Sequence, residues 1–261
     1  MKKINHIMLI SLAILLLVNN AFANGMAVSE IPGNSVIPIE QSEIRLLKEK
    51  VTIIPTKKGT IIDNSDSAFD VTAIFLFENT SSKKVAIQMG FPFTKDTEPP
   101  RRTFLGEKKA GVFTHFEKNF VVKINGKETK VEKKSVGENI KLKIGTQYDH
   151  AFVWEVTFNP REKKEVRCFY DIEWDAPDPR DLSRSFRYIT KTGALWKNNI
   201  KEASFYIKLG KYMADEIARK ETELEIKPKG YKLTDNRVIE WTFKNWKPKE
   251  DIEIRVWDIR E

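Results

Sequence analysis

The sequence predicts a mainly β protein made of two antiparallel β-sandwich domains, with one short helix in the second domain. Apolar residues recur at every second position through most of the chain, turn signals separate these rows, and one segment has helical spacing. Of the 261 residues, 41% are hydrophobic and 31% are charged, which excludes a collagenous or low-complexity chain. We therefore expect folded domains built from many short strands.

The most regular rows of the first domain lie between residues 70 and 125. Residues 70–79 carry apolar side chains on both alternating faces, a pattern typical of a central strand covered on both sides. Residues 120–124 alternate up to Asn125-Gly126, the pair favoured in two-residue turns because both central positions need a positive φ. This second row therefore predicts a hairpin.

Two longer rows follow, at residues 152–158 and 166–174, and the turn Asn159–Glu162 between them predicts a second hairpin. Cys168, the single cysteine, lies on the apolar face of the later row. A buried, inert thiol is expected there, because a reactive cysteine needs an accessible and electropositive setting.

A proline-rich segment at residues 176–184 interrupts the strand pattern and predicts a linker between the domains. The first domain is then residues 24–175, and the second, smaller β-rich domain is residues 185–261. Helical spacing of apolar residues appears at 211–221. The spacing of Pro177 and Pro179 indicates a stiff connector with a groove between the domains.

Residues 1–23 have the features of a secretory signal peptide. Lys2 and Lys3 precede a 12-residue, mainly apolar run, and Ala21-Phe22-Ala23 provides small residues where a signal peptidase reads them. The run is short for a bilayer, whose crossing takes about 20 residues. We expect cleavage after Ala23, a periplasmic or extracellular location, and no permanent membrane span in the mature chain.

The formal net charge is +8, with lysines scattered among glutamates rather than gathered in a block. This distribution is typical of a solvated surface, because nucleic-acid binders concentrate positive charge on one face. Together with export, it argues against a nucleic-acid partner. An envelope polymer or a partner protein remains as the expected binding partner.

Several long segments resemble a known family. They are DVTAIFLFENTSSKKVAIQMGFPF at 70–93, RYITKTGALWKNNIKEASFYIKL at 187–209 and WTFKNWKPKEDIEIRVW at 241–257, together with Asn24-Gly25-Met26-Ala27 at the expected mature terminus. These look like the domain of unknown function 4424 family of secreted bacterial proteins. The resemblance implies export and a β-rich fold, and it supplies no active residues.

Arginines gather beside the two least regular segments. Arg101 and Arg102 lie in the polar stretch 94–114, and Arg180, Arg184 and Arg187 lie at the linker or just after it. A guanidinium donates to carboxylate or phosphate in a fork, so these five arginines predict an anion-preferring site between the domains. The alternative is a solvated surface with 94–114 as a plain surface loop.

Two tryptophans are candidates for ligand contact. Trp196 follows the turn at Thr192-Gly193, and Trp246 lies in the loop Asn245–Pro248. Each is read either as an anchor in the core or as an exposed platform on which a sugar stacks. We therefore include both among the candidate ligand-binding residues.

The sequence has no recognisable catalytic, metal or cofactor signature. It lacks a zinc motif, a nucleophile elbow and a glycine-rich phosphate loop. We accordingly expect no catalytic residues, no metal ligands and no cofactor, and a non-catalytic module that binds an envelope component or a partner protein. The alternative is a glycan-active hydrolase that uses a pair of carboxylates.

The expected export leads to a testable prediction. When the full gene product is expressed in a bacterial host, the recovered protein should have the intact mass of residues 24–261, because the signal is removed after Ala23. A full-length chain in the membrane fraction would show instead that the segment is an anchor.

Overall fold

Strands dominate the structure. The computed structural model describes residues 22–23, 25–31, 35–55, 68–93, 119–136, 150–173, 183–220, 222–235 and 237–258. In chain order the elements are β1 (Phe22–Ala23), β2 (Met26–Ile31), β3 (Ser35–Ile39), β4 (Ile44–Pro55), β5 (Ala68–Asn79), β6 (Val85–Phe93), β7 (Val121–Ile124), β8 (Lys127–Glu128), β9 (Glu132–Val136), β10 (His150–Phe158), β11 (Lys163–Glu173), β12 (Ser183–Ile189), the 3-10 helix η2 (Lys191–Leu195), β13 (Ile200–Lys208), α2 (Lys211–Arg219), β14 (Thr222–Lys227), β15 (Lys232–Thr234), β16 (Val238–Trp246) and β17 (Ile252–Asp258). The predicted mainly β class is confirmed, and α2 is the predicted short helix.

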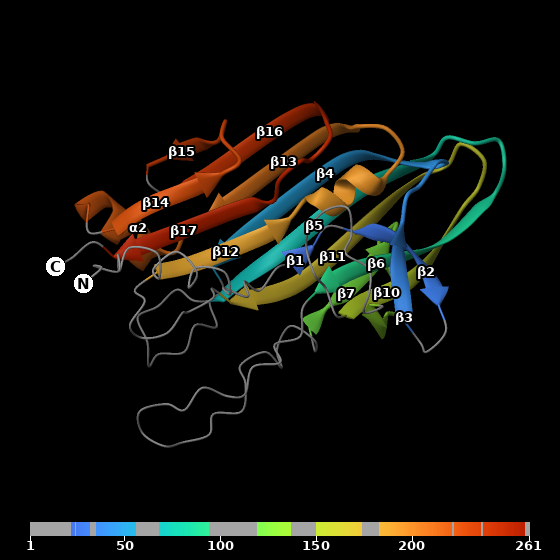
Figure 1. The fold of residues 1–261 in the computed structure, drawn as a ribbon, viewed down its shortest axis with the longest axis horizontal. Coiled ribbons are helices and arrows are strands. Elements are labelled where there is room, and N and C mark those ends of the chain that lie inside the picture. Colours follow the sequence, from blue (N-terminus) through green and yellow to red (C-terminus); the bar gives the residue numbers. More distant parts are fainter. Residues whose placement is uncertain are drawn as a thin grey trace, which may run out of the picture.

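The strands form two sheets that pack face to face (Figure 1). Sheet A has nine strands in the order β10-β9-β3-β2-β6-β1-β12-β17-β14, and sheet B has eight in the order β15-β16-β13-β4-β5-β11-β7-β8. Their inner faces meet in a large hydrophobic core. Phe91 of sheet A and Tyr170 of sheet B, for example, have ring centroids 5.1 Å apart.

Each sheet combines strands from both sides of the predicted linker. In sheet A, strands β12, β17 and β14 come from the second predicted domain, and in sheet B strands β15, β16 and β13 do. The two predicted units thus form the two ends of one sandwich, with β4 beside β13 in its middle (Figure 1). One core cluster also extends from Phe75 in β5 to Trp241 in β16.

In sheet B the two ends of the sandwich are joined by the parallel pairing of β4 with β13. This pairing is called the joint. Six register pairs run from Glu202↔Lys48 to Ile207↔Ile53. The inward side chains of Phe205 and Val51 lie opposite each other and are both buried. Among the described strands β1–β12 and β3–β9 are also parallel, so the antiparallel pattern expected from the sequence describes most pairings but not these three.

One predicted hairpin is confirmed and the other is wrong. Asn125 and Gly126 have φ values of 49° and 83° and join β7 to β8, as expected. By contrast, β10 pairs with β6 and β9 in sheet A, whereas β11 pairs with β5 and β7 in sheet B. The turn at Asn159–Glu162 therefore carries the chain from one sheet to the other. Alternation reveals an apolar face but does not distinguish strands paired edge to edge from strands packed face to face.

The predicted central strand is β5, which pairs with β4 on one edge and β11 on the other. Its inner residues, such as Phe75 and Phe77, are fully buried. The outer residues Ile74 and Leu76 are only half-buried, so the expectation that both faces are covered is wrong for this strand. The aliphatic outer row instead lies among charged side chains of neighbouring strands.

Gly90 marks a close approach of β2 and β6. A Cβ atom at Gly90 would lie 2.7 Å from Cγ1 of Val28. Gly90→Ala should therefore lower the free energy of unfolding by about 1–3 kcal/mol, the usual cost of overpacking, as measured by urea titration. Gly25→Ala is the matched control, because its Cβ would meet only Cε of Met89 at 3.7 Å. Equal stability losses in the two variants would contradict this assignment.

Candidate functional site

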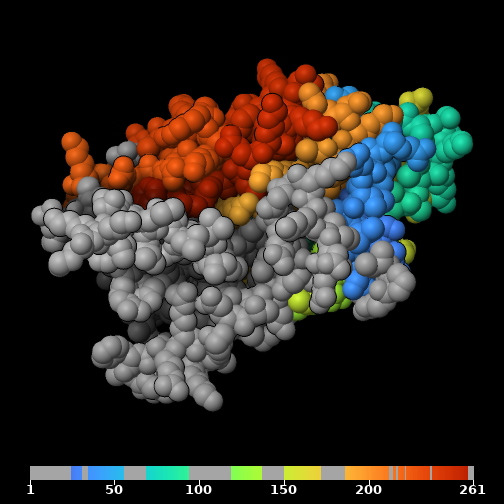
Figure 2. Space-filling model, in the orientation of Figure 1, coloured from blue at the N-terminus to red at the C-terminus, as the bar shows by residue number. Residues whose placement is uncertain are grey.

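A pocket of about 350 Å³ opens where the two ends of the sandwich join. Because β4 and β13 are parallel, both begin at the same end of sheet B, and the antiparallel β16 ends there. The segments next to these strand ends supply the lining, which consists of Glu40, Gln41, Ser42, Ala194, Leu195, Trp196, Lys197, Asn198 and Lys247. The pocket is thus built from both sides of the predicted linker. Figure 2 shows residues of the first part of the chain, in blue, against the orange C-terminal part on one face.

Backbone hydrogen bonds hold the two main walls together. The amide of Gln41 donates to the carbonyl of Leu195 over 2.8 Å, and the amide of Lys197 donates to the carbonyl of Ile44 over 3.1 Å. The segment before β4 is therefore hydrogen-bonded to the residue directly before Trp196 and to the residue directly after it, at the end of η2. These two backbone hydrogen bonds help to set the spacing of the walls.

Trp196 is a buried part of this lining. Its side chain is 3% exposed, and its indole Nε1–H donates to the carbonyl of Gly25 over 2.9 Å. Its ring centroid lies 4.7 Å from that of Phe77 in β5. These contacts agree with the core-anchor interpretation, because a stacking platform needs an exposed ring face.

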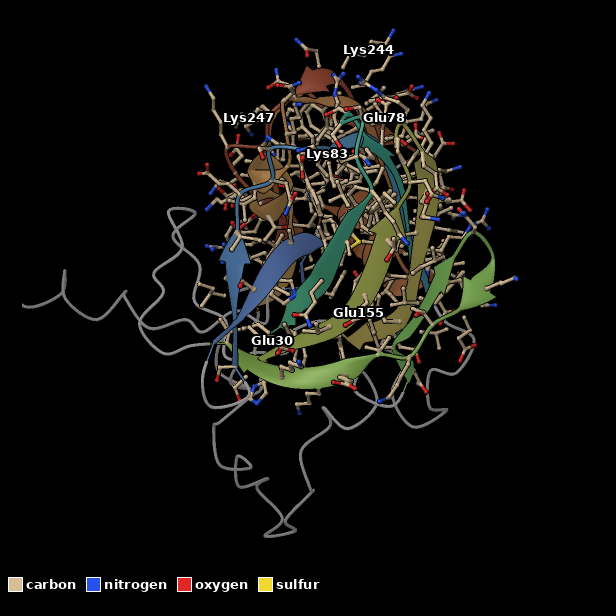
Figure 3. The ribbon with its side chains drawn as sticks, turned by 90° about the vertical axis from the view of Figure 1, so that its right-hand side faces the viewer. Glu30, Glu78, Lys83, Glu155, Lys244 and Lys247 are labelled. Atoms are coloured by element: carbon tan, nitrogen blue, oxygen red, sulfur yellow. The ribbon has the colours of Figure 1, made fainter. Side chains whose placement is uncertain are left out.

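The charged groups of the pocket are Glu40, Lys197 and Lys247. The Lys197 ammonium donates to Oγ1 of Thr80 over 2.8 Å and is half-buried. Lys247 is exposed and extends outward from its end of the molecule, as Figure 3 shows. Two ammonium groups and one carboxylate give the pocket a net positive lining that attracts an anion.

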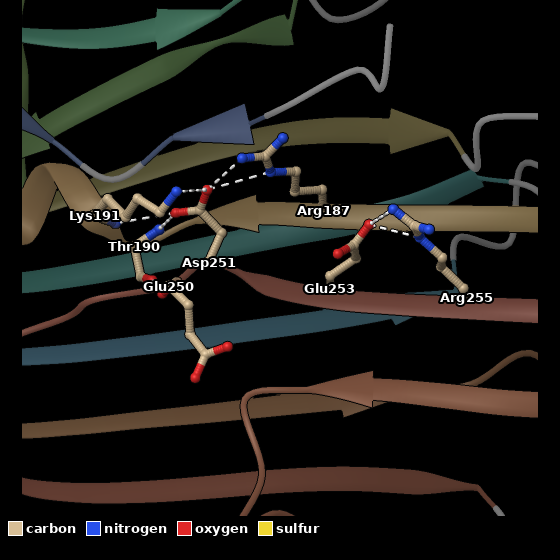
Figure 4. A network of polar contacts seen from close by, with 7 residues as sticks. All are labelled: Arg187, Thr190, Lys191, Glu250, Asp251, Glu253 and Arg255. Carbon is tan, nitrogen blue, oxygen red and sulfur yellow. Dashed lines mark hydrogen bonds and ion pairs between the residues drawn. The ribbon is translucent and has the colours of Figure 1, made fainter. Parts of the chain in front are cut away.

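A buried carboxylate fixes the start of η2 (Figure 4). Oδ1 of Asp251 accepts hydrogen bonds from the amides of Thr190 and Lys191 at 3.0 and 3.1 Å. Oδ2 accepts from Nη2 of Arg187 at 2.6 Å and lies 3.8 Å from Nζ of Lys191. Asp251 is only 4% exposed in its side chain, so it holds η2, and with it one pocket wall, against the loop before β17.

A second buried carboxylate lies in the joint between the two ends. Glu49 in β4 is 1% exposed and lies opposite Ala203 of β13 in the register. The Tyr188 hydroxyl, which comes from sheet A, donates to Oε1 of Glu49 over 3.4 Å. Burial, together with the nearby Glu49, raises the pKa of the Tyr188 phenol well above its usual value. The pair links the two sheets at the joint.

Most of the predicted anion site lies outside the described residues. This is true of Arg101, Arg102 and Arg180, and of the stretch 94–114. The backbone of Arg184 pairs with Val256 across β12 and β17, but its side chain is also outside the description. The side chain of Arg187 is described, and it forms an ion pair with Asp251. The grouping of the other four arginines stays a prediction.

The structure describes the surroundings of Trp246, and it identifies pocket residues that the sequence did not predict. Trp246 is half-buried and stacks on Phe243, with ring centroids 4.3 Å apart and an interplanar angle of 9°. The sequence reasoning missed Lys197, Lys247 and residues 40–42. Lys197 and Lys247 directly follow the candidate tryptophans Trp196 and Trp246, and this proximity was the usable signal.

The described residues give no sign of a metal centre or a reactive thiol. Among them, no group of three or more His, Cys, Asp or Glu side chains is arranged to hold a metal ion. Cys168 is fully buried, and burial raises the pKa of its thiol. This agrees with the expected inert cysteine, because nucleophilic thiols have a lowered pKa.

A solved structure from Legionella pneumophila is similar to this chain along most of its length. No protein-family model and no curated protein matches the sequence. The Legionella protein, named a "putative nutrient binding protein", aligns with a TM-score of 0.65 over 92% of this chain and 71% of its own. The two proteins share a fold. Their sequence identity is 19%, so the likeness concerns the fold alone, and the resemblance to the domain of unknown function 4424 family stays a prediction.

The structural likeness to enzymes is much weaker. An M1 zinc metallopeptidase from Deinococcus radiodurans aligns over 84% of this chain and 43% of its own, with a TM-score of 0.34 and 6% identity. A score this low supports no inference about this chain. Within the described residues, no helix combines the length and apolar character needed to cross a membrane.

The Asp251 network can be tested by substitution. Asp251→Asn should lower the free energy of unfolding by about 1–3 kcal/mol, because Arg187 and Lys191 lose their charged partner. Glu253→Gln is the matched control on the next strand, where Glu253 accepts from Nε of Arg255 at 2.7 Å at a more exposed position. Its cost should be about 0–1 kcal/mol. If Glu253→Gln lowers the free energy of unfolding in urea as much as Asp251→Asn does, then Asp251 has no special role.

Proposed function

We propose that this chain is an exported, non-catalytic binding protein whose pocket, at the join of the two ends of the sandwich, takes an acidic sugar unit of an envelope polymer. The observation that carries the proposal is the pocket itself, which backbone hydrogen bonds preorganise and which Lys197 and Lys247 line. Preformed pockets of roughly 300–1,000 Å³ are the usual form of small-molecule sites. The fold shared with the Legionella protein is consistent with a binding role.

The lining favours a ligand that carries both a negative charge and hydroxyl groups. The Lys247 ammonium is free to approach a carboxylate, since it is exposed at the rim. Glu40, Gln41 and Ser42 on the facing wall provide acceptors for hydroxyl protons. A sugar acid matches both walls, whereas a simple inorganic anion matches only the lysine side.

The lining favours binding over glycoside hydrolysis. Glycosidases place two carboxylates on opposite sides of the scissile bond. Glu40 is the single acidic residue among the lining residues that the structure describes. Among the described lining residues, Glu40 therefore has no second carboxylate with which to cleave a glycan.

The proposal is tested by calorimetric titration of the mature protein with a galacturonic acid oligomer as the probe. Binding should weaken as salt rises, because the lysine contacts are screened. Lys247→Glu should weaken binding at least about tenfold, the equivalent of one lost hydrogen bond to a charged group. Lys244→Glu makes the same change in charge at an exposed position of β16, apart from Lys247 in Figure 3, and should bind within about twofold of the unchanged protein.

Three results would overturn the proposal. The first is an equal loss of binding affinity in the two lysine variants, which would mean that the probe is attracted to the basic surface in general. The second is binding that is indifferent to salt. The third is the release of shorter sugars from the probe during the titration, which would identify a hydrolase.

A further inference from the structure

A stacked pair of aromatic rings lies at the end of β16, beside the pocket. Trp246 stacks on Phe243 with ring centroids 4.3 Å apart and an interplanar angle of 9°. Trp246 also pairs in register with Ile200 at the start of β13. Asn198 and Lys247, which lie within two residues of this pair along the chain, both belong to the pocket lining. The indole therefore adjoins the pocket along both strands.

The backbone conformation at Asn245 turns Trp246 to the inner side of sheet B. Strand alternation alone would place Trp246 on the outer face, with the exposed Lys244 two positions earlier. Asn245, between them, has a φ of 48°, and its carbonyl accepts a hydrogen bond from Nδ2 of Asn199 over 3.0 Å. This break in the alternation brings the indole to Phe205, with ring centroids 5.8 Å apart. The position of the ring is therefore set by the backbone.

The aromatic neighbours of Trp246 leave one face of its ring open. The centroid of Phe205 lies 6.1 Å from that of Phe243 and 5.8 Å from that of Trp246, with interplanar angles of 69° and 77°. A ring at nearly equal distances from both members of a stack borders its side and does not cover the indole face opposite Phe243. Because Phe243 precedes Trp246 along β16, that face is turned toward the end of the strand, where the pocket opens. Trp246 is accordingly only half-buried.

The indole of Trp246 also keeps a hydrogen-bond donor available. Among the described residues, none accepts a hydrogen bond from its Nε1–H. By contrast, the Nε1–H groups of the buried Trp196 and Trp241 donate to the carbonyls of Gly25 and Pro228 over 2.9 and 3.0 Å. An open indole face with an available N–H suits a sugar, because the ring C–H groups of a sugar pack on the face and its hydroxyls accept hydrogen bonds.

We propose that Trp246 forms a second sugar subsite, in which the unit next to the one held in the pocket stacks on the open face of the indole. The inference rests on the proposed function and extends it to two consecutive units of the polymer. Lys247 in the pocket recognises the negative charge of one unit, whereas Trp246 offers an apolar surface to its neighbour. Burial of that apolar area adds affinity for a chain of sugars over a single sugar.

The test compares galacturonic acid with its linear trimer in calorimetric titrations of the mature protein. The trimer should bind at least about tenfold more tightly than the single sugar, the equivalent of one aromatic contact. Trp246→Ala should reduce this ratio of affinities to less than about threefold, whereas Trp246→Phe keeps an aromatic face and should retain most of it. Tyr206→Ala is the matched control, because Tyr206 is a half-buried aromatic residue on the outer face of β13, and it should leave the ratio unchanged.

A second measurement does not depend on the stability of Trp246→Ala. The trimer should change the indole fluorescence of the unchanged protein, because a sugar on the open face removes water from the ring. The single sugar should produce a much smaller change. The change caused by the trimer should be lost in Trp246→Phe, which still binds the trimer but lacks this indole.

Failure of the subsite and failure of the pocket give different results. The subsite is overturned if the trimer binds no more tightly than the single sugar, if the ratio survives Trp246→Ala or falls equally in Tyr206→Ala, or if the fluorescence change survives Trp246→Phe. The proposed function stands in these cases as long as the single sugar binds and Lys247→Glu weakens its binding. If neither sugar binds, or if Lys247→Glu has no effect, the proposed function is overturned and the subsite with it.

Discussion

The parallel pairing of β4 with β13 is the contact on which the rest of the molecule depends. It joins strands that lie about 150 residues apart in the sequence and merges two sets of strands into one sheet. Its register is fixed by burial, because a shift by one residue would turn Phe205 and Val51 away from the core. Glu49 on the same inner face has a partner in Tyr188 of the opposite sheet, so the joint also sets how the two layers lie over each other. A buried polar contact of this kind costs more when broken than it contributes when made, and it therefore favours one arrangement over its neighbours.

The candidate site follows from that pairing. Parallel neighbours begin at the same end of a sheet, so the residues before β4 and before β13 meet, and β16 returns to the same end. The walls are then fixed by backbone contacts and by Asp251, which holds the start of η2. The pocket-lining residues lie on short connecting segments, as is common for binding residues supported by a rigid scaffold. The proposed binding residues and the scaffold are thus different parts of the chain.

The sequence predicted the local elements well and their partners less well. Alternation identified β5, β7, β10 and β11, and helical spacing identified α2, because these patterns depend on which side chains are buried. The same alternation suggested a hairpin at Asn159–Glu162, since a row of apolar residues does not reveal whether its strand pairs with or packs against the next. The pocket residues Lys197 and Lys247 were missed for a related reason. Their meeting depends on a long-range parallel pairing, so their positions directly after Trp196 and Trp246 do not reveal that the two lysines line one pocket. Trp196 was a candidate with two interpretations, and its burial, its contact with Phe77 and its hydrogen bond to Gly25 separate them.

The distance between β4 and β13 along the chain has a consequence for how the protein forms. Folding rates fall as the mean sequence separation of native contacts grows, and parallel pairing between distant strands closes late. While the chain emerges from its N-terminus, β4 can pair with β5 but has no partner on its other edge until the residues up to about 208 have followed. During that interval β4 is an edge strand with alternating apolar residues, the type of surface that pairs with strands of other chains. Its exposed charges at Lys48 and Lys50 interrupt the outer row and are typical of residues that discourage such pairing. The same strand that unites the finished molecule is therefore the part of it most open to misassembly while the molecule is being made.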